Sequence, residues 1–201
     1  DGYTLVEIDY CVAPETKVLC QDLLWRFAGE LKEGDAVIGF DEELAQQSCY
    51  KPATVLQTQR IIRPCVKVTT TKGSIIVSEE HRFLSRINSY GRKWMMAKDL
   101  KPHHQLAYMA EPWEYDTSRE AGYLAGFFDG EGWLTKTHVG FGQNEGPTLE
   151  YVLGLLQERN FDFFRSQGSS TANCYITNMA DGMRFIGSIR PPRLLAKSRA
   201  L

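Results

Sequence analysis

The apolar pattern of this chain changes once, near residue 111, and this change limits the folds that the chain can adopt. From Tyr3 to about Ala110 the sequence is a series of short alternating or β-branched runs, separated by glycine, aspartate and proline. Runs of this kind are typical of strands joined by turns. Beyond the polar stretch EPWEYDTSRE at 111–120, segments with helical spacing alternate with short strand-like runs. We therefore predict an all-β domain followed by an α+β domain.

The second half of the chain divides into recognisable elements. Ser118 is a suitable N-cap for a helix that carries EAGYLAGFFDG. A hairpin over 133–143 and a helix over 148–160 are expected next, then strands FDFFRS and NCYITN and helical segments MADGMRFIGSI and RLLAKSRAL. The predicted order is helix, hairpin, helix, hairpin, helix. In the first half, the segments at 29–40 and 97–108 echo each other, which indicates two related halves.

Composition excludes several classes of protein. The 23 basic and 25 acidic residues leave no net positive field, so any nucleic-acid binding has to come from local patches. No apolar run approaches the roughly 18 residues of a membrane span, and the first ten residues lack a signal-type segment. Scattered cysteines without a CxxC pair argue against a disulfide framework and a zinc site. We expect a cytoplasmic protein without a membrane partner. The five cysteines are Cys11, Cys20, Cys49, Cys65 and Cys174.

The first half contains a thiol and a closely spaced hydroxyl and imidazole pair. Cys11 opens CVAPETKVLC, and GSIIVSEEH carries Ser78 and His81 three residues apart. A thiol is a good nucleophile, and hydroxyl and imidazole groups can polarise a carbonyl and protonate a leaving amine. On composition alone, a buried structural thiol is the better interpretation of Cys11. A hydrogen-bonded surface or core histidine is likewise the better interpretation of His81.

A family resemblance changes this balance. CVAPETKVLC, ELKEGDAVIGFDEE, GSIIVSEEHRFLS and KWMMAKDLK together resemble the Hint module of inteins, the protein-splicing elements. The resemblance implies an all-β Hint horseshoe of two pseudo-symmetric halves over 11–112. It implies that Cys11 attacks the carbonyl of Tyr10 in an N-to-S acyl shift, without a cofactor. His81 would protonate or distort this scissile amide, and Ser78 would help to hold it.

The sequence departs from the intein pattern at two places. Ser78 stands where the family usually has threonine, a change that keeps the hydroxyl group. His103 and His104 stand where the second half commonly has glycine and aspartate, and we assign these two histidines to a solvated loop with no catalytic role. Inteins also end in His–Asn before a nucleophile, whereas this chain ends in KSRAL. We therefore expect the N-terminal segment of a split or truncated intein, which needs a C-terminal intein segment as its partner.

If Cys11 is the first intein residue, residues 1–10 are a remnant of the host protein. DGYTLVEIDY resembles a strand and metal-binding aspartate of family A DNA polymerases, with Asp9 in the place of that aspartate. An ordinary leading β-strand is the alternative interpretation of these ten residues.

The stretch LAGFFDGEG at 124–132 resembles the LAGLIDADG motif of homing endonucleases. The resemblance implies an α+β domain of αββαββα order over 113–201, which cleaves double-stranded DNA. It places Glu131 at the metal-binding acid and Asp129 at the second acid, which in the family is more often structural, with Gly130 between them in the predicted Mg²⁺ site. A helix packed on a sheet and closed by a glycine cap is the alternative. Carboxylate oxygens are ligands that Mg²⁺ prefers.

A single motif per chain implies a homodimer that pairs its two motif helices. Small side chains let helix backbones approach closely, and Gly122, Ala125 and Gly126 form the predicted dimer interface. Gly130 and Gly132 are predicted to turn the chain off the end of the helix. The predicted auxiliary and DNA-binding residues are Gln143, near the active-site water, and Arg190, Arg193 and Lys197, for phosphates. A solvated basic face explains those three cations equally well.

The sequence thus predicts an intein segment that activates the Tyr10–Cys11 bond and carries a nested, dimeric, Mg²⁺-dependent endonuclease. The alternative is a DNA-binding or assembly module in which both the splicing and the nuclease centres are vestigial.

Overall fold

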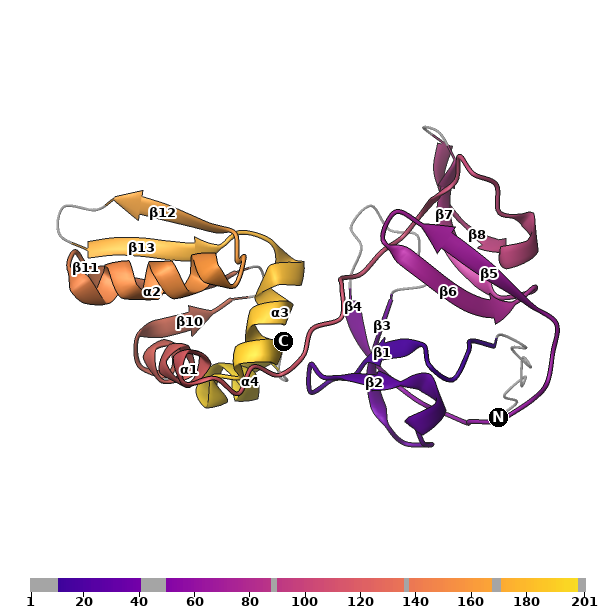
Figure 1. Cartoon of the computed structure of the whole chain (residues 1–201), viewed down its shortest axis with the longest axis horizontal. Helices are drawn as coiled ribbons and strands as arrows, with labels where there is room; N and C mark the ends of the chain where they lie inside the picture. The colour runs from indigo at the N-terminus through magenta and orange to yellow at the C-terminus, as the bar shows by residue number, and fades with distance from the viewer. Residues whose placement is uncertain (1–10, 41–49, 88–89, 136–137, 168–170, 199–201) are drawn as a thin grey trace, which may run out of the picture. The chain divides into compact units, whose positions relative to one another are not determined.

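The computed structural model describes residues 11–40, 50–87, 90–135, 138–167 and 171–198 (Figure 1). The chain divides into two compact units, of which the first comprises residues 1–20 and 26–111 and the second comprises 21–25 and 112–201. The predicted host remnant at 1–10, which includes Asp9 and Tyr10, lies outside the described residues, as does Cys49. Both units are described separately below.

The first unit is built from short strands and two single-turn 3₁₀ helices. Its elements are β1 (Lys17–Leu19), β2 (Trp25–Phe27), η1 (Ala28–Glu30), β3 (Ala36–Phe40), β4 (Tyr50–Thr54), β5 (Cys65–Thr70), β6 (Gly73–Ser78), β7 (Arg82–Ile87), β8 (Tyr90–Met96), η2 (Ala97–Asp99) and β9 (Gln105–Leu106). β1 pairs with β2, β3 with β4, and β5 with β6, while β7 lies between β8 and β9. Adjacent strands therefore pair mainly as local hairpins.

The predicted fold class, which combined an all-β horseshoe with an αββαββα domain, is wrong, because the described part of the first unit forms no horseshoe. The described residues form a mixed α/β chain with five small sheets of two to four strands, and no horseshoe or closed sheet is present among them. Hairpins between neighbouring strands need only short loops to close. β5 leaves four of its six residues exposed, so it does not act as the central strand of a larger sheet. The apolar runs predicted strands correctly but did not determine how the hairpins join.

The second unit contains all four α-helices of the described chain and a four-stranded sheet. Its elements are α1 (Arg119–Glu131), β10 (Gly132–Leu134), β11 (Val139–Asn144), α2 (Pro147–Glu158), β12 (Phe163–Gln167), β13 (Thr171–Ile176), α3 (Met179–Ile189) and α4 (Pro192–Ser198). The helices and hairpins predicted from the sequence for this half are confirmed as individual elements, and α4 falls within the predicted helical segment RLLAKSRAL. The strands lie in the order β10-β11-β13-β12, all antiparallel.

The core of the second unit is aromatic. Phe128 on α1 is fully buried, and its ring centroid lies 5.2 Å from that of Phe141 on β11 and 4.4 Å from that of Phe185 on α3. Phe161 extends the cluster to Phe185 at 5.4 Å. These rings join the motif helix to one face of the sheet, so the position of α1 is fixed by packing. Its end, at Glu131, is fixed with it.

Two helix starts follow from the local sequence. Ser118 caps α1 as predicted, because its Oγ accepts a hydrogen bond from the backbone N–H of Ala121 at 3.2 Å. Gly146 precedes α2 with φ of 148°, a conformation that glycine adopts readily, and Pro147 occupies the first turn. The bounds of both helices are therefore set by residues that local rules identify.

A segment from the first part of the sequence completes the second unit. Leu23, at φ of 61°, is 5 % exposed, and its carbonyl accepts a hydrogen bond from Trp113 Nε1 at 3.0 Å. A Cβ atom on Gly187 of α3 would lie 2.3 Å from that same Nε1 atom, so only glycine fits there. No pattern in residues 21–25 predicts that they pack in this unit.

Candidate functional site

Cys11 and Ser78 lie together although 67 residues separate them. The backbone N–H of Cys11 donates to Ser78 Oγ at 3.3 Å, and the backbone N–H of Ser78 donates to the Cys11 carbonyl at 3.0 Å. An antiparallel bridge between Val12 and Val77 sets Cys11 opposite the end of β6. The nitrogen held by Ser78 belongs to the Tyr10–Cys11 peptide bond. The structure therefore describes the Cys11 side of that bond, while Tyr10 is outside the described residues.

Ser78 is fully buried, whereas Cys11 is partly exposed and carries a free thiol. The hydroxyl group therefore has a defined environment, and solvent can reach the thiol. Cys65 lies opposite Ser78 in the β5–β6 pairing and is exposed.

A tight turn brings His81 to the same place. Its backbone N–H donates to the Ser78 carbonyl at 3.0 Å, and its carbonyl accepts from the N–H of Ala97 at 2.7 Å. The imidazole ring lies edge-on to Phe83, with centroids 5.0 Å apart. Burial lowers the pKa of His81 below its usual value of 6.5. Its imidazole is therefore neutral at neutral pH, the form that can take up a proton.

His103 and His104 lie in a turn elsewhere in the first unit, as the sequence suggested. The Nδ1 atom of His104 accepts from the backbone N–H of Lys101 at 3.2 Å. The backbone N–H of His104 donates to the Lys101 carbonyl at 2.9 Å. These bonds give His104 a role in forming the turn.

Asp129 and Arg193, which the sequence assigned to metal and phosphate, bind each other. The carboxylate of Asp129 accepts from the backbone N–H of Arg193 at 3.0 Å, where α4 begins. The Arg193 guanidinium donates to the carbonyls of Asp129 and Gly132 at 2.6 Å each, and of Phe128 at 3.1 Å. A cation at the carbonyl end of a helix is favourable. This pair therefore closes the C-terminus of α1.

Glu131 and Gly130 occupy the exposed end of α1. The exposed Glu131 carboxylate supplies oxygen donors of the kind that Mg²⁺ prefers, whereas the carbonyls of Phe128, Asp129 and Gly132 already accept from Arg193. One chain supplies few such donors, and no group of three or more His, Cys, Asp or Glu side chains placed to hold a metal occurs among the described residues. A second copy of Glu131 would add the missing carboxylate.

Gln143 lies near this end of the sheet. Gly132, directly after Glu131, pairs with Phe141, and Gln143 is two residues further along β11. Residues two apart on a strand share a face, so the side chains of Gln143 and Phe141 lie on the same face of the sheet. The Oε1 atom of Gln143 accepts from the backbone N–H of Asn144 at 2.8 Å.

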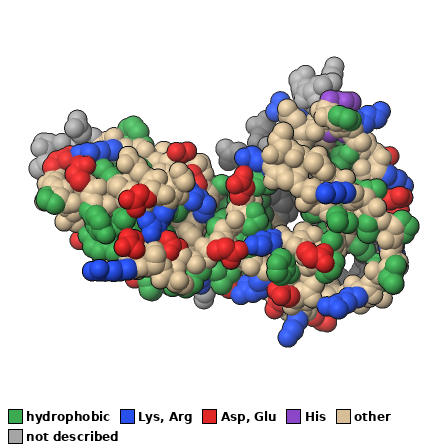
Figure 2. All heavy atoms as spheres, in the orientation of Figure 1, with side chains coloured by type: hydrophobic (Ala, Val, Ile, Leu, Met, Phe, Trp, Pro, Cys, Tyr) green, Lys and Arg blue, Asp and Glu red, His purple; other side chains and the backbone are tan. Residues whose placement is uncertain are grey.

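The remaining predicted cations differ in their surroundings. Arg190 ends α3 in the left-handed region, at φ of 57°, and donates to the Asp22 carbonyl at 3.0 Å. Lys197 is exposed in the last turn of α4. Arg190 and Arg193 both donate to backbone carbonyls, whereas the side chain of Lys197 faces solvent. Acidic and basic side chains alternate on the surface in view, without a continuous basic patch (Figure 2).

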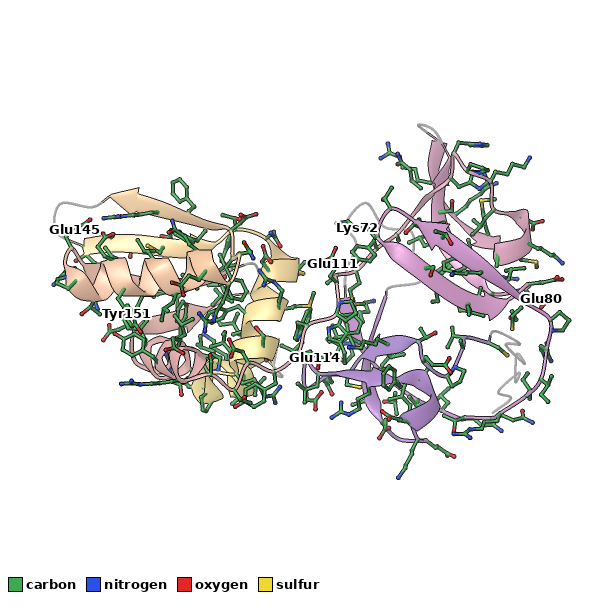
Figure 3. The ribbon with its side chains drawn as sticks, in the orientation of Figure 1. Lys72, Glu80, Glu111, Glu114, Glu145 and Tyr151 are labelled. Carbon is green, nitrogen blue, oxygen red and sulfur yellow. The ribbon has the colours of Figure 1, made fainter. Side chains whose placement is uncertain are left out.

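The predicted dimer residues lie along an open strip of α1. A Cβ atom on Gly122, Gly126 or Gly130 would have no neighbour within 4 Å. These glycines are spaced by four, which places them on one side of a helix. Ala125 is partly buried beside them. Tyr123 also faces this region, with its ring 5.0 Å from that of Tyr151 on α2, which is labelled in Figure 3.

The structure gives Gly130 and Gly132 a different role from the predicted turn. Gly130 is still helical, and Gly132 ends the helix with φ of −82°, which any residue can adopt. A Cβ atom on Gly132 would instead lie 2.5 Å from the carbonyl oxygen of Phe128. Gly132 is therefore required by close approach, and Gly130 belongs to the open strip.

Sequence reasoning missed Trp133, two residues after Glu131. Its indole ring covers Gly140 and Gly142 on β11. The signal available was the Gly-x-Gly spacing in VGFGQ, opposite a large aromatic residue across a predicted hairpin.

Compared with known protein families, the chain gives no match, and it matches no curated protein either. In the part of the chain that the structure describes, no helix has the length and apolar character needed to cross a bilayer.

Proposed function

We propose that the first unit carries out an N-to-S acyl shift at the Tyr10–Cys11 bond, as the N-terminal segment of an intein does. The observation that carries this proposal is the hydrogen bond from the Cys11 N–H to Ser78 Oγ at 3.3 Å. The Cys11 sulfur adds to the Tyr10 carbonyl carbon, and the bond from that carbon to the Cys11 nitrogen breaks. The thiol proton ends on the nitrogen, which leaves an amine and a thioester.

Ser78 suits this reaction because a hydroxyl group both accepts and donates hydrogen bonds. It accepts from the amide N–H in the starting state. As the nitrogen gains a lone pair, the same hydroxyl can rotate and donate to it. An interaction that strengthens as the bond breaks favours the transition state. The neutral imidazole of His81 provides a base for the thiol proton and can return it to the amine.

Ser78 variants test this proposal. A thiol such as dithiothreitol releases residues 1–10 from the thioester, and the rate of release is followed by mass spectrometry. Ser78→Ala should slow release by roughly 100-fold, and Ser78→Thr by less than about threefold, because it keeps the hydroxyl. Ser74→Ala, at an exposed position on the same strand, is the matched control. Release from folded Ser78→Ala at the wild-type rate would contradict the proposal.

The open glycine strip of α1 favours a second function, cleavage of double-stranded DNA by a homodimer. Pairing of two α1 helices along Gly122 and Gly126 would bring two copies of Glu131 together, where Mg²⁺ can be bound by carboxylates and water. Gly126→Leu should prevent dimer formation in sedimentation experiments. Glu131→Gln should keep the dimer and abolish Mg²⁺-dependent cleavage.

The same experiments address the alternative, a DNA-binding or assembly module with vestigial centres. That alternative predicts dimers or DNA complexes without cleavage and without thiol-induced release. The proposed splicing activity requires a C-terminal intein segment as partner. It is compatible with the cytoplasm, because a reducing compartment keeps the Cys11 thiol free.

A further inference from the structure

One face of the four-stranded sheet carries a row of aromatic side chains. Trp133 on β10 pairs with Gly140, Gly140 with Tyr175 on β13, and Tyr175 with Phe164 on β12. Directly opposite residues of antiparallel strands share a face, so the three rings lie on one side. Phe164 is 57 % exposed, and Tyr175 and Trp133 are partly exposed. The row therefore spans the sheet from edge to edge.

The indole ring of Trp133 lies over a floor of glycine. A Cβ atom on Gly140 would lie 2.9 Å from Cε2 and Cζ2 of the ring, and one on Gly142 would lie 3.7 Å from Cζ3. Tyr175 meets the indole edge-on, with centroids 5.8 Å apart. One face of the indole is thus supported by backbone, and the Trp133 side chain as a whole is partly exposed.

Among the described strand residues, the rest of this face carries no charged side chain. The strand residues around the rings are Asn144, Ser166, Thr171 and Asn173. The one arginine on the described strands of this sheet, Arg165, belongs to the opposite face, opposite Cys174, and is paired with Glu145, which Figure 3 labels. His138 adds an imidazole 6.3 Å from Tyr175. The surface thus combines flat rings with amide and hydroxyl groups.

This chemistry does not suit the backbone of a DNA duplex, because binding to duplex phosphates depends on lysine and arginine. It suits unpaired bases, whose flat faces stack on aromatic rings and whose edges bond to amide and hydroxyl groups. We propose that this face binds unpaired nucleobases by stacking on Trp133, so that a double-stranded substrate of the second unit is locally unpaired at the bound position.

The position of Trp133 connects this surface to the proposed nuclease centre, and in this respect the inference rests on the proposed function. Glu131 precedes Trp133 by two residues, a span of about 7 Å of extended chain. Trp133 lies on the sheet face opposite Phe141, against which α1 packs, so a bound strand reaches the Glu131 end of α1 by passing the edge strand β10. Enzymes that act on nucleic acid commonly hold an unstacked base in this manner.

Fluorescence anisotropy of the full chain with a labelled oligothymidylate of about 12 nucleotides tests the inference, with a duplex of equal length as the comparison. The oligothymidylate should bind more tightly than the duplex, with little dependence on salt, because few phosphates are neutralised. Trp133→Leu should weaken binding by about tenfold or more, and Trp133→Phe by less than about threefold. Trp94→Leu, at an exposed tryptophan of the first unit, should leave binding unchanged.

Phe164→Ala provides a second test at an exposed position, and it should weaken binding by about threefold or more. Glu131→Gln should bind as the wild type does, and a wild-type chain that binds the oligothymidylate but cleaves no DNA would count against the nuclease proposal alone. Tighter binding of the duplex, a steep salt dependence, or unchanged binding by folded Trp133→Leu and Phe164→Ala would overturn the inference. Displacement of the bound oligothymidylate by a neutral oligosaccharide would also overturn the inference.

Discussion

Replacing Arg193 by alanine should loosen the C-terminus of α1. Its guanidinium donates to three carbonyls, of Phe128, Asp129 and Gly132, at 2.6 to 3.1 Å. Arg193 is exposed, so water can replace each bond, and we take about 0.5 kcal/mol for each, the low end of the usual range. Loss of a cation from a helix C-terminus costs about 0.5 kcal/mol more. Arg193→Ala should therefore lower the local opening free energy by about 2 kcal/mol.

Amide hydrogen exchange of α1 measures this local free energy directly. Exchange in the last turn of α1 should become about 30-fold faster in Arg193→Ala, the ratio that 2 kcal/mol implies. Lys197→Ala, at an exposed cation of the same helix α4, is the matched control and should leave exchange unchanged. Unchanged exchange in Arg193→Ala, together with weaker DNA binding, would refute this reasoning and restore Arg193 as a phosphate contact.

Two further predictions concern stability. Gly132→Ala should destabilise the second unit by about 2 kcal/mol, because its Cβ meets a backbone oxygen. Gly130→Ala should be neutral or stabilise the unit by up to about 1 kcal/mol. Urea titrations that rank the two variants in the opposite order would contradict the roles given to these two glycines. Burial alone would raise the pKa of Asp116, but hydrogen bonds from Ser118 and Arg159 hold it below its usual value. A lowered carboxyl pKa contributes stability above the unfolded value, and this contribution is lost as pH falls below about 4. Asp116→Asn should therefore flatten the acid limb of the stability profile, and an unaltered limb would show that this carboxyl is not responsible.

The elements of the second unit were predictable because their signals are local. The N-cap at Ser118 and the alternation along β11 and β13 require only neighbouring residues to be read. The arrangement of the first unit was not predictable in the same way, because strand pairing beyond the hairpin depends on contacts far apart in sequence. The packing of residues 21–25 in the second unit is a contact of that kind, and no periodicity marks it.

The candidate sites show the same division. The pairing of Cys11 with Ser78 was predicted through the family resemblance, since spacing alone gives no reason for residues 67 apart to meet. The resemblance also assigned Asp129 and Arg193 to ligands, whereas the structure shows them bound to each other. A sequence shows that a charge is present but not whether another part of the chain already binds it.

The central claim is that Cys11 can accept the acyl group of Tyr10. Mass spectrometry of the full chain after incubation with dithiothreitol tests it most directly. The peptide DGYTLVEIDY should be released as its thioester adduct or acid, and Cys11→Ala should remain intact under the same conditions. A folded wild-type chain that stays intact, or equal release from Cys11→Ala, would contradict the account.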